Sequence, residues 1–237
     1  MFYQPGVTDH GLPNDPFKAC VVPRPIGWIG TANSEGQNHN LAPYSQFTNV
    51  TFSPPTVMFS ANVGFEGDSK DSARNAEKSG EFTWSLATWD LREAVNKSAE
   101  MVSSDVDEFN LSGVTKQFGE VVKAPMVKES PVKFECRYLT TLRIPGEGLM
   151  GSVDIIVGRV VGIHIEDSVL TNGRLDIGKT MPIARCGYFQ YAVIRAENIF
   201  EMRIPGDARS GIGLEGNAAK NKVLLDEAKH RTNGDTS

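Results

Sequence analysis

Short runs of β-branched and aromatic residues, separated by turn-forming residues, recur along most of the chain, and each run predicts a β-strand. The longest run contains Gly158 and Gly162, and a bend at either glycine would let that strand curve around a barrel. The predicted strands cover residues 21–29, 56–62, 81–87, 132–142, 151–165 and 189–199.

Two segments in the middle of the chain have helical patterns. The first helix is expected to begin at Ser69, as its N-cap, and to stop at Gly80. The second is expected to begin at Asp90, with Glu93 completing a pair that resembles a capping box. Its apolar positions, which fall on one helical face, are Leu91, Ala94, Val95 and Val102.

The order of these elements is strands, two helices and strands again, without a repeating strand–helix unit. This order favours an antiparallel barrel with helical insertions over a doubly wound sheet, and so a mainly β fold. We expect an N-terminal arm over residues 1–18 and the main domain over residues 19–203. Residues 204–237 are expected to form a Gly-rich linker and a helical tail, with an amphipathic segment over residues 217–230.

Composition and charge narrow the function. The chain has 237 residues and a formal net charge of -5, which argues against a nucleic-acid-binding protein. No apolar run approaches a membrane span and no signal peptide is evident, so a cytoplasmic location is expected. Cys20, Cys136 and Cys186 are far apart and predict neither a metal site nor a disulfide; they are expected to be small core residues.

The predicted helix start at residues 69–72 is one candidate for chemistry. Free N–H groups of a first helical turn attract anions, and Ser72 and Lys70 would add a hydroxyl and a positive charge. Arg74 and Lys78 continue the basic spacing of four residues. Asp71 adds a negative charge, which disfavours a bound phosphate. The alternative is an ordinary capped surface helix.

A second candidate is the segment at residues 40–47, NLAPYSQF, in which polar groups alternate with a proline and two aromatic residues. Such a corner can form hydrogen bonds with the heteroatoms at the edge of a flat ring. The alternative is a strand crossing with Tyr44 and Phe47 in the core. A third feature, Gly211 to Gly216, matches GxGxxG, but it lacks the flanking strands of a dinucleotide fold and is interpreted as a linker.

Taken together, the ordered series PRPIGWIGT, NLAPYSQF, PP, SKDSARN and GEF resembles the flavin reductase-like family, especially its flavoredoxin-type branch. The resemblance implies an FMN-binding, Greek-key split β-barrel. It also implies a homodimer with the flavin near the subunit interface. This chain has Ser72 where the family usually has Thr, and Trp84 and Ser85 where Val and Asn are commoner. The cofactor-binding positions implied by the resemblance are Trp28, Asn40, Ala42, Pro43, Tyr44, Ser45, Ser60, Asn62, Lys70, Ser72 and Asn75.

Flavin chemistry needs no catalytic side chain, and the scattered histidines suggest none. The resemblance therefore implies an FMN-dependent oxidoreductase that moves hydride from NADH or NADPH to flavin. Free flavin, a partner monooxygenase or another redox protein would be the acceptor. The alternative is an FMN-holding electron carrier without its own nicotinamide site. A third hypothesis, an enzyme similar to pyridoxamine-phosphate oxidase, lacks a dedicated substrate-phosphate cluster.

Overall fold

The computed structural model describes residues 1–148, 150–203, 205, 222–223 and 226. The chain divides into two compact units, Met1–Asn198 and Ile199–Ser237. The GxGxxG match, nearly all of the predicted linker and all but three residues of the predicted amphipathic segment lie outside the described residues. None of the described helices is long and apolar enough to cross a membrane.

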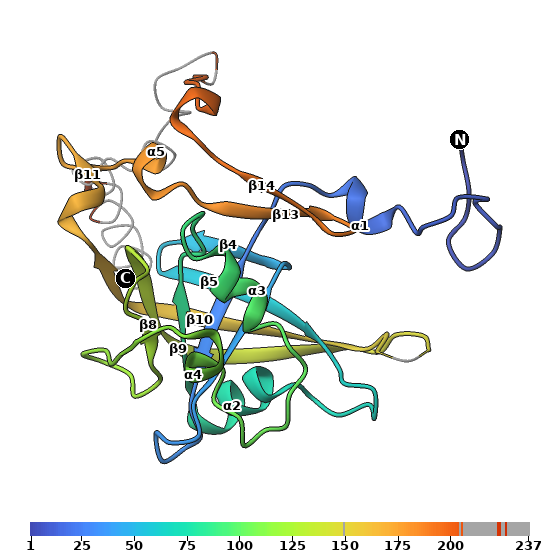
Figure 1. Ribbon diagram of the computed structural model, residues 1–237, viewed down its shortest axis with the longest axis horizontal. Coiled ribbons are helices and arrows are strands. Elements are labelled where there is room, and N and C mark those ends of the chain that lie inside the picture. Colours follow the sequence, from blue (N-terminus) through green and yellow to red (C-terminus); the bar gives the residue numbers. More distant parts are fainter. Residues whose placement is uncertain (149, 204, 206–221, 224–225, 227–237) are drawn as a thin grey trace, which may run out of the picture. The chain divides into compact units, whose positions relative to one another are not determined.

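A seven-stranded antiparallel sheet dominates the first unit (Figure 1). Its two outermost strands, β3 and β4, are joined in sequence by only Ser45 and Gln46, and the backbone N–H of Ser60 in β5 donates to the Gln46 carbonyl. The mainly β, antiparallel prediction is thus confirmed, whereas Greek-key closure stays a prediction. In sheet order the strands are β3 (Asn40–Tyr44), β2 (Gly27–Thr31), β6 (Glu81–Ser85), β9 (Val132–Ile144), β10 (Val153–Ile165), β5 (Pro55–Asn62) and β4 (Phe47–Phe52).

Smaller elements surround this sheet. A three-stranded antiparallel sheet has the order β1 (Arg24–Pro25), β13 (Ile183–Gly187) and β14 (Gln190–Val193). Two short hairpins pair β7 (Lys116–Gln117) with β8 (Met126–Val127), and β11 (Leu170–Thr171) with β12 (Arg174–Leu175). The helices are α1 (Phe17–Cys20), α2 (Asp71–Ser79), α3 (Arg92–Lys97), α4 (Glu108–Ser112) and α5 (Ile177–Thr180), with 3-10 turns η1 (Asp167–Val169) and η2 (Ala196–Asn198).

The bend expected in the strand at residues 151–165 is present in β10. The register of β10 against β9 shifts between Val157 and Gly158 and again between Val160 and Gly162. At Gly158 an added Cβ would lie 2.3 Å from Cε1 of Phe82. The strand therefore needs glycine there because the Phe82 ring, on β6 two strands away in the sheet, occupies the space of a side chain.

Several predicted boundaries were wrong. The single strand predicted at residues 189–199 is only the four-residue β14, and its partner β13 was not predicted. The first predicted strand is divided into β1 and β2, which belong to different sheets. Cys136 is buried as expected, but Cys20 is exposed.

The helix starts also differ from the prediction. The N-cap of α2 is Lys70, because the Ser69 hydroxyl instead donates to Oδ2 of Asp154 at 2.6 Å. The expected stop at Gly80 is confirmed, with a φ of 76° that favours glycine. The second helix begins at Arg92 rather than at Asp90 and ends at Lys97, so Val102 lies outside it.

Two buried clusters flank the β2–β3 hairpin. Ile29 belongs to the cluster between the strands of the large sheet, whereas its neighbour Trp28 faces the other cluster. Alternation along β2 thus sends successive side chains to opposite sides. Val95 of α3 and Phe109 of α4 pack into the Trp28 cluster, which fixes these short helices next to β3.

Candidate functional site

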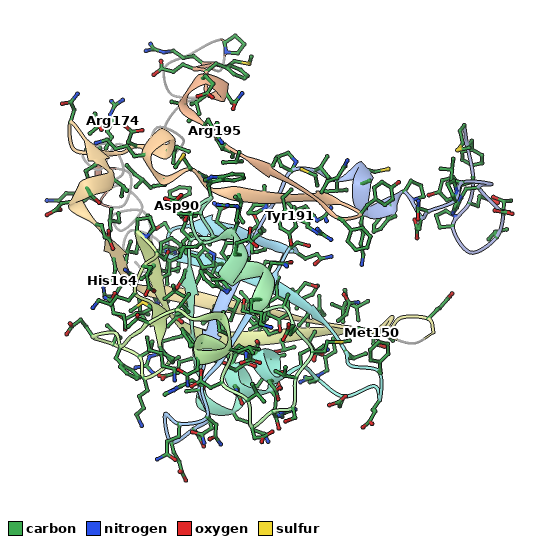
Figure 2. All side chains as sticks on the ribbon, viewed as in Figure 1. Asp90, Met150, His164, Arg174, Tyr191 and Arg195 are labelled. Carbon is green, nitrogen blue, oxygen red and sulfur yellow. The ribbon has the colours of Figure 1, made fainter. Side chains whose placement is uncertain are left out.

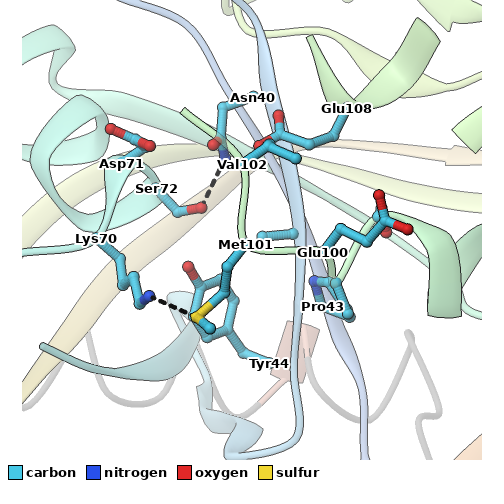
Figure 3. A pocket seen from close by; sticks show the side chains of 13 residues that line it. Asn40, Pro43, Tyr44, Lys70, Asp71, Ser72, Glu100, Met101, Val102 and Glu108 are labelled. Atoms are coloured by element: carbon cyan, nitrogen blue, oxygen red, sulfur yellow. Dashed lines mark hydrogen bonds between the residues drawn. The ribbon is translucent and has the colours of Figure 1, made fainter. Parts of the chain in front are cut away.

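A pocket of about 200 Å³ lies where β3, the start of α2 and the segment after α3 meet (Figure 3). Asn40 to Tyr44 of β3 form one wall, the first turn of α2 forms another, and residues 98–102 close the third side. The lining residues are Asn40, Ala42, Pro43, Tyr44, Lys70, Asp71, Ser72, Ser98, Ala99, Glu100, Met101, Val102 and Glu108.

Hydrogen bonds hold α2 against the hairpin that carries β3. The Asn40 amide and the Ser72 hydroxyl lie 2.8 Å apart. One turn further along the helix, Nδ2 of Asn75 donates to Oγ1 of Thr31 at 3.3 Å. The helix start and the β3 corner are therefore positioned relative to each other by side chains from both elements.

The start of α2 has the features of an anion site. Its N-cap residue, Lys70, makes no side-chain capping bond, so no side chain satisfies the N–H groups of the first turn. The Lys70 ammonium lies beside this turn, 4.0 Å from Sδ of Met101. Free N–H groups, the helix dipole and one cation together favour a bound phosphate or carboxylate.

Two of the three carboxylates that line the pocket, Asp71 and Glu100, form ion pairs. Asp71 forms an ion pair with Arg74, and Arg74 also donates to the Ser69 carbonyl. Glu100 pairs with Lys97 at 2.6 Å. The charge of Asp71, which in the sequence argued against an anion site, is therefore offset by a guanidinium three residues along the same helix.

Burial shifts the pKa of two titratable groups that line the pocket, Glu108 and Tyr44. Glu108 is buried, and this raises its pKa above the usual value even though its Oε2 accepts a 3.1 Å hydrogen bond from the backbone N–H of Leu41. Burial also raises the pKa of Tyr44 to about 12, against a smaller lowering by the Ser72 hydroxyl. The Tyr44 phenol is therefore neutral at physiological pH and available as a hydrogen-bond donor.

The structure brings together six of the eleven positions selected from the sequence: Asn40, Ala42, Pro43, Tyr44, Lys70 and Ser72 line the pocket. The other five do not line it. Trp28 is fully buried beneath it, and its indole N–H donates to the hydroxyl of Ser98 at 2.9 Å. Asn75 lies further along α2 and Ser45 directly follows β3. Ser60 and Asn62 lie on β5, which contributes no lining residue, and Asn62 donates to the Met150 carbonyl at 2.9 Å.

Sequence reasoning missed the third wall, residues 98–102, and the buried acid Glu108. One signal was available: Asp107 caps α4 by accepting from the N–H groups of Phe109 and Asn110, a pattern typical of a helix start. Nothing local indicates that Glu108 turns inward. Its position follows from Phe109, which anchors α4 in the core.

Comparison with known proteins shows which family this chain belongs to. The model of the flavin reductase-like domain matches residues 19–183. An uncharacterized protein of Halalkalibacterium halodurans is 32% identical over 172 residues, which is 73% of this chain and 82% of that protein.

Solved structures agree with this match. Nitrilotriacetate monooxygenase component B from Bacillus cereus aligns with a TM-score of 0.76 at 27% identity. The alignment covers 85% of this chain and 98% of that protein's chain. Flavoredoxin of Desulfovibrio vulgaris has the same fold, with a TM-score of 0.63 at 18% identity over 86% of this chain and 97% of its own. The chain belongs to the flavin reductase-like family.

Proposed function

We propose that this protein is an FMN-dependent oxidoreductase, built on a Greek-key split barrel, that transfers hydride from NADH or NADPH to flavin. The observation that carries the proposal is the pocket itself. Two motifs about 25 residues apart, the β3 corner and the α2 start, form its facing walls. One wall suits a flat polar ring, and the other suits a phosphate.

The chain's own residues fit the anionic end of FMN. The Lys70 ammonium, the Ser72 hydroxyl and the free N–H groups of α2 would hold the phosphate, as charge-assisted hydrogen bonds are the strong ones. Ser72 is only 1% exposed and already contacts Asn40, so its hydroxyl is fixed in direction. Arg74 keeps Asp71 from repelling the phosphate by pairing with it.

The β3 corner fits the ring end. Pro43 stiffens the strand, Ala42 leaves space, and the neutral phenol of Tyr44 can donate to a ring heteroatom. Once bound, FMN supplies the hydride-accepting atom, and the protein supplies orientation and solvent control. Trp28 would affect the site indirectly, because its indole N–H holds the hydroxyl of Ser98, which lines the pocket. Ser45, Ser60, Asn62 and Asn75 stay predicted contacts.

We also propose that the working form is a homodimer. The pocket of about 200 Å³ is smaller than the roughly 300–1,000 Å³ of typical small-molecule sites, so one subunit alone encloses only part of FMN. Strands β9 and β10 also carry exposed apolar side chains, which a second copy would cover. These are Leu139, Leu142, Ile144, Val161, Ile163 and Ile165.

The likeness to component B of a monooxygenase supports a partner monooxygenase as electron acceptor, and we place this exchange in the cytoplasm as part of the proposal. The test is the visible spectrum of the purified protein with FMN, before and after NADH or NADPH. We expect bound flavin that bleaches and reoxidises with turnover of the nicotinamide. Retained flavin that neither nucleotide reduces would favour the electron carrier, and a protein that retains no flavin would refute both.

A further inference from the structure

A second pocket, of about 250 Å³, lies on the other side of α3 from the candidate FMN site. Trp89 and Tyr191 of β14 supply its two aromatic rings, and Ile183 and Val193 also line it. Figure 2 labels Tyr191 and Arg195 in this part of the molecule. None of the positions selected from the sequence lines this pocket.

Backbone contacts hold the walls of this pocket in place. Trp89 N–H donates to the Met181 carbonyl at 2.9 Å, and Thr88 and Pro182 form a β-bridge. The segment that carries Trp89 is thus tied to the start of β13. Because β13 pairs with β14, both aromatic walls belong to one connected framework.

Guanidinium groups surround the two rings. Arg92 lies 4.2 Å from the centre of the Trp89 ring, and Arg195 lies 5.5 Å from the same centre. Arg185 lies 4.6 Å from the Tyr191 ring, its direct cross-strand partner. Three arginines therefore lie over two rings that line one pocket, and one of them, Arg92, lines the pocket itself.

Most of this positive charge is uncompensated. Within the described part of the chain, neither Arg185 nor Arg195 forms an ion pair. Arg92 has only the exposed Glu93, at 3.4 Å, and Asp90 is an exposed acid beside Trp89. Aromatic walls with excess guanidinium charge suit a flat ring that carries a phosphate.

A third hollow is lined by residues of α3 and shares lining residues with both pockets. The hollow runs along α3 and shares Glu93 and Asn96 with the Trp89–Tyr191 pocket and Glu100 with the FMN site. The helix has six residues, so the path is short, about 9 Å along its axis. Lys97 lines the hollow and pairs with Glu100 at 2.6 Å.

We propose that the Trp89–Tyr191 pocket binds the adenosine phosphate end of the nicotinamide dinucleotide. This inference rests on the proposed function. It names the residues of this chain that bind the adenosine end of the nicotinamide dinucleotide. A dinucleotide has a base at each end and a pyrophosphate between them. Its nicotinamide would reach the flavin while Arg92 and Arg195 hold the adenosine phosphate.

The test is calorimetric titration of the purified protein with AMP, with adenosine and with inorganic phosphate as separate probes. We expect saturable AMP binding, with adenosine and phosphate each at least about tenfold weaker, because the pocket needs both ring and charge. Arg195→Gln should weaken AMP about tenfold by the same reasoning. Arg174→Gln, at an exposed arginine of β12 outside the pocket, is the matched control and should change nothing.

A steady-state measurement completes the test. Arg195→Gln should raise KM for NADH or NADPH with little change in kcat, and should leave FMN affinity unchanged. Equal AMP binding by Arg195→Gln and Arg174→Gln, or AMP binding no tighter than adenosine, would overturn the inference. Arg195-dependent AMP binding in a protein that oxidises neither nucleotide would support the pocket while contradicting the proposed reductase function.

Discussion

The side chains of Asn40 and Ser72 lie 2.8 Å apart and join the β3 corner to the first turn of α2. The residues are 32 positions apart in sequence, and both are buried. A buried polar pair of this kind holds two elements in one relative orientation, since breaking it would leave an unsatisfied group. The candidate FMN pocket owes its shape to this contact.

The buried acid Glu108 makes stability depend on pH. Its pKa is raised mainly by burial, so above pH 4.5 the folded protein retains a proton that the unfolded chain releases. Stability from this group therefore falls as pH rises from 4.5 through the raised pKa. Glu108→Gln should remove this fall, which urea unfolding at a series of pH values would measure. The exposed Glu100→Gln is the control, and a profile for Glu108→Gln parallel to the wild type would contradict the assignment.

The opposite dependence is expected at Glu135. Burial acts to raise its pKa, but hydrogen bonds from His164 at 2.7 Å and from the N–H groups of Glu120, Val121 and Val122 outweigh it and lower the pKa. Stability from this group is present above pH 4.5 and is lost as pH falls through the lowered pKa.

Glu135→Gln should therefore lower the free energy of unfolding at pH 7 by about 3 kcal/mol, because it removes a buried charge that accepts hydrogen bonds from several donors. Urea denaturation measures this directly. Glu35→Gln, at an exposed position, should change stability by less than about 0.5 kcal/mol. A loss at Glu135 no larger than that of the control would show that the network contributes little.

The bend in β10 gives a prediction about packing. Gly158→Ala would place a Cβ 2.3 Å from the Phe82 ring and should cost about 2–3 kcal/mol in unfolding free energy. Gly67→Ala meets no neighbour within 4 Å but has a φ of +81°, so only backbone strain of about 1–2 kcal/mol is expected there. Thermal unfolding of both variants compares overpacking with strain, and a Gly158→Ala protein as stable as the wild type would refute the close contact.

Local pattern was sufficient where one residue type decides the structure. Gly158 and Gly162 indicated the bend in β10, and Gly80, whose φ of 76° favours glycine, indicated the end of α2. The β3 corner and the α2 start were likewise found from their residue types, and the structure brings them together.

Long-range contacts decided what the sequence did not reveal. Ser69 is a good N-cap residue, yet Asp154, 85 positions away, binds its hydroxyl, so the cap moves to Lys70. Val102 continues an apolar spacing, but α3 ends at Lys97 and Val102 instead lines the pocket.

The central claim is that Lys70 and Ser72 hold the phosphate of FMN, and removing both side chains tests it. Lys70→Ala with Ser72→Ala should weaken FMN binding by about 2–4 kcal/mol through lost charge-assisted hydrogen bonds. Lys78→Ala, at the exposed far end of the same helix, removes an equal charge and should have little effect. Unfolding of each variant controls for damage to the fold.

Flavin fluorescence titration with FMN and with riboflavin, which lacks the phosphate, is the most direct measurement. The wild type should bind FMN more tightly than riboflavin, and the double variant should lose that preference while keeping its riboflavin affinity. A preference for FMN that survives in the double variant would contradict the account, because the phosphate would then be held elsewhere.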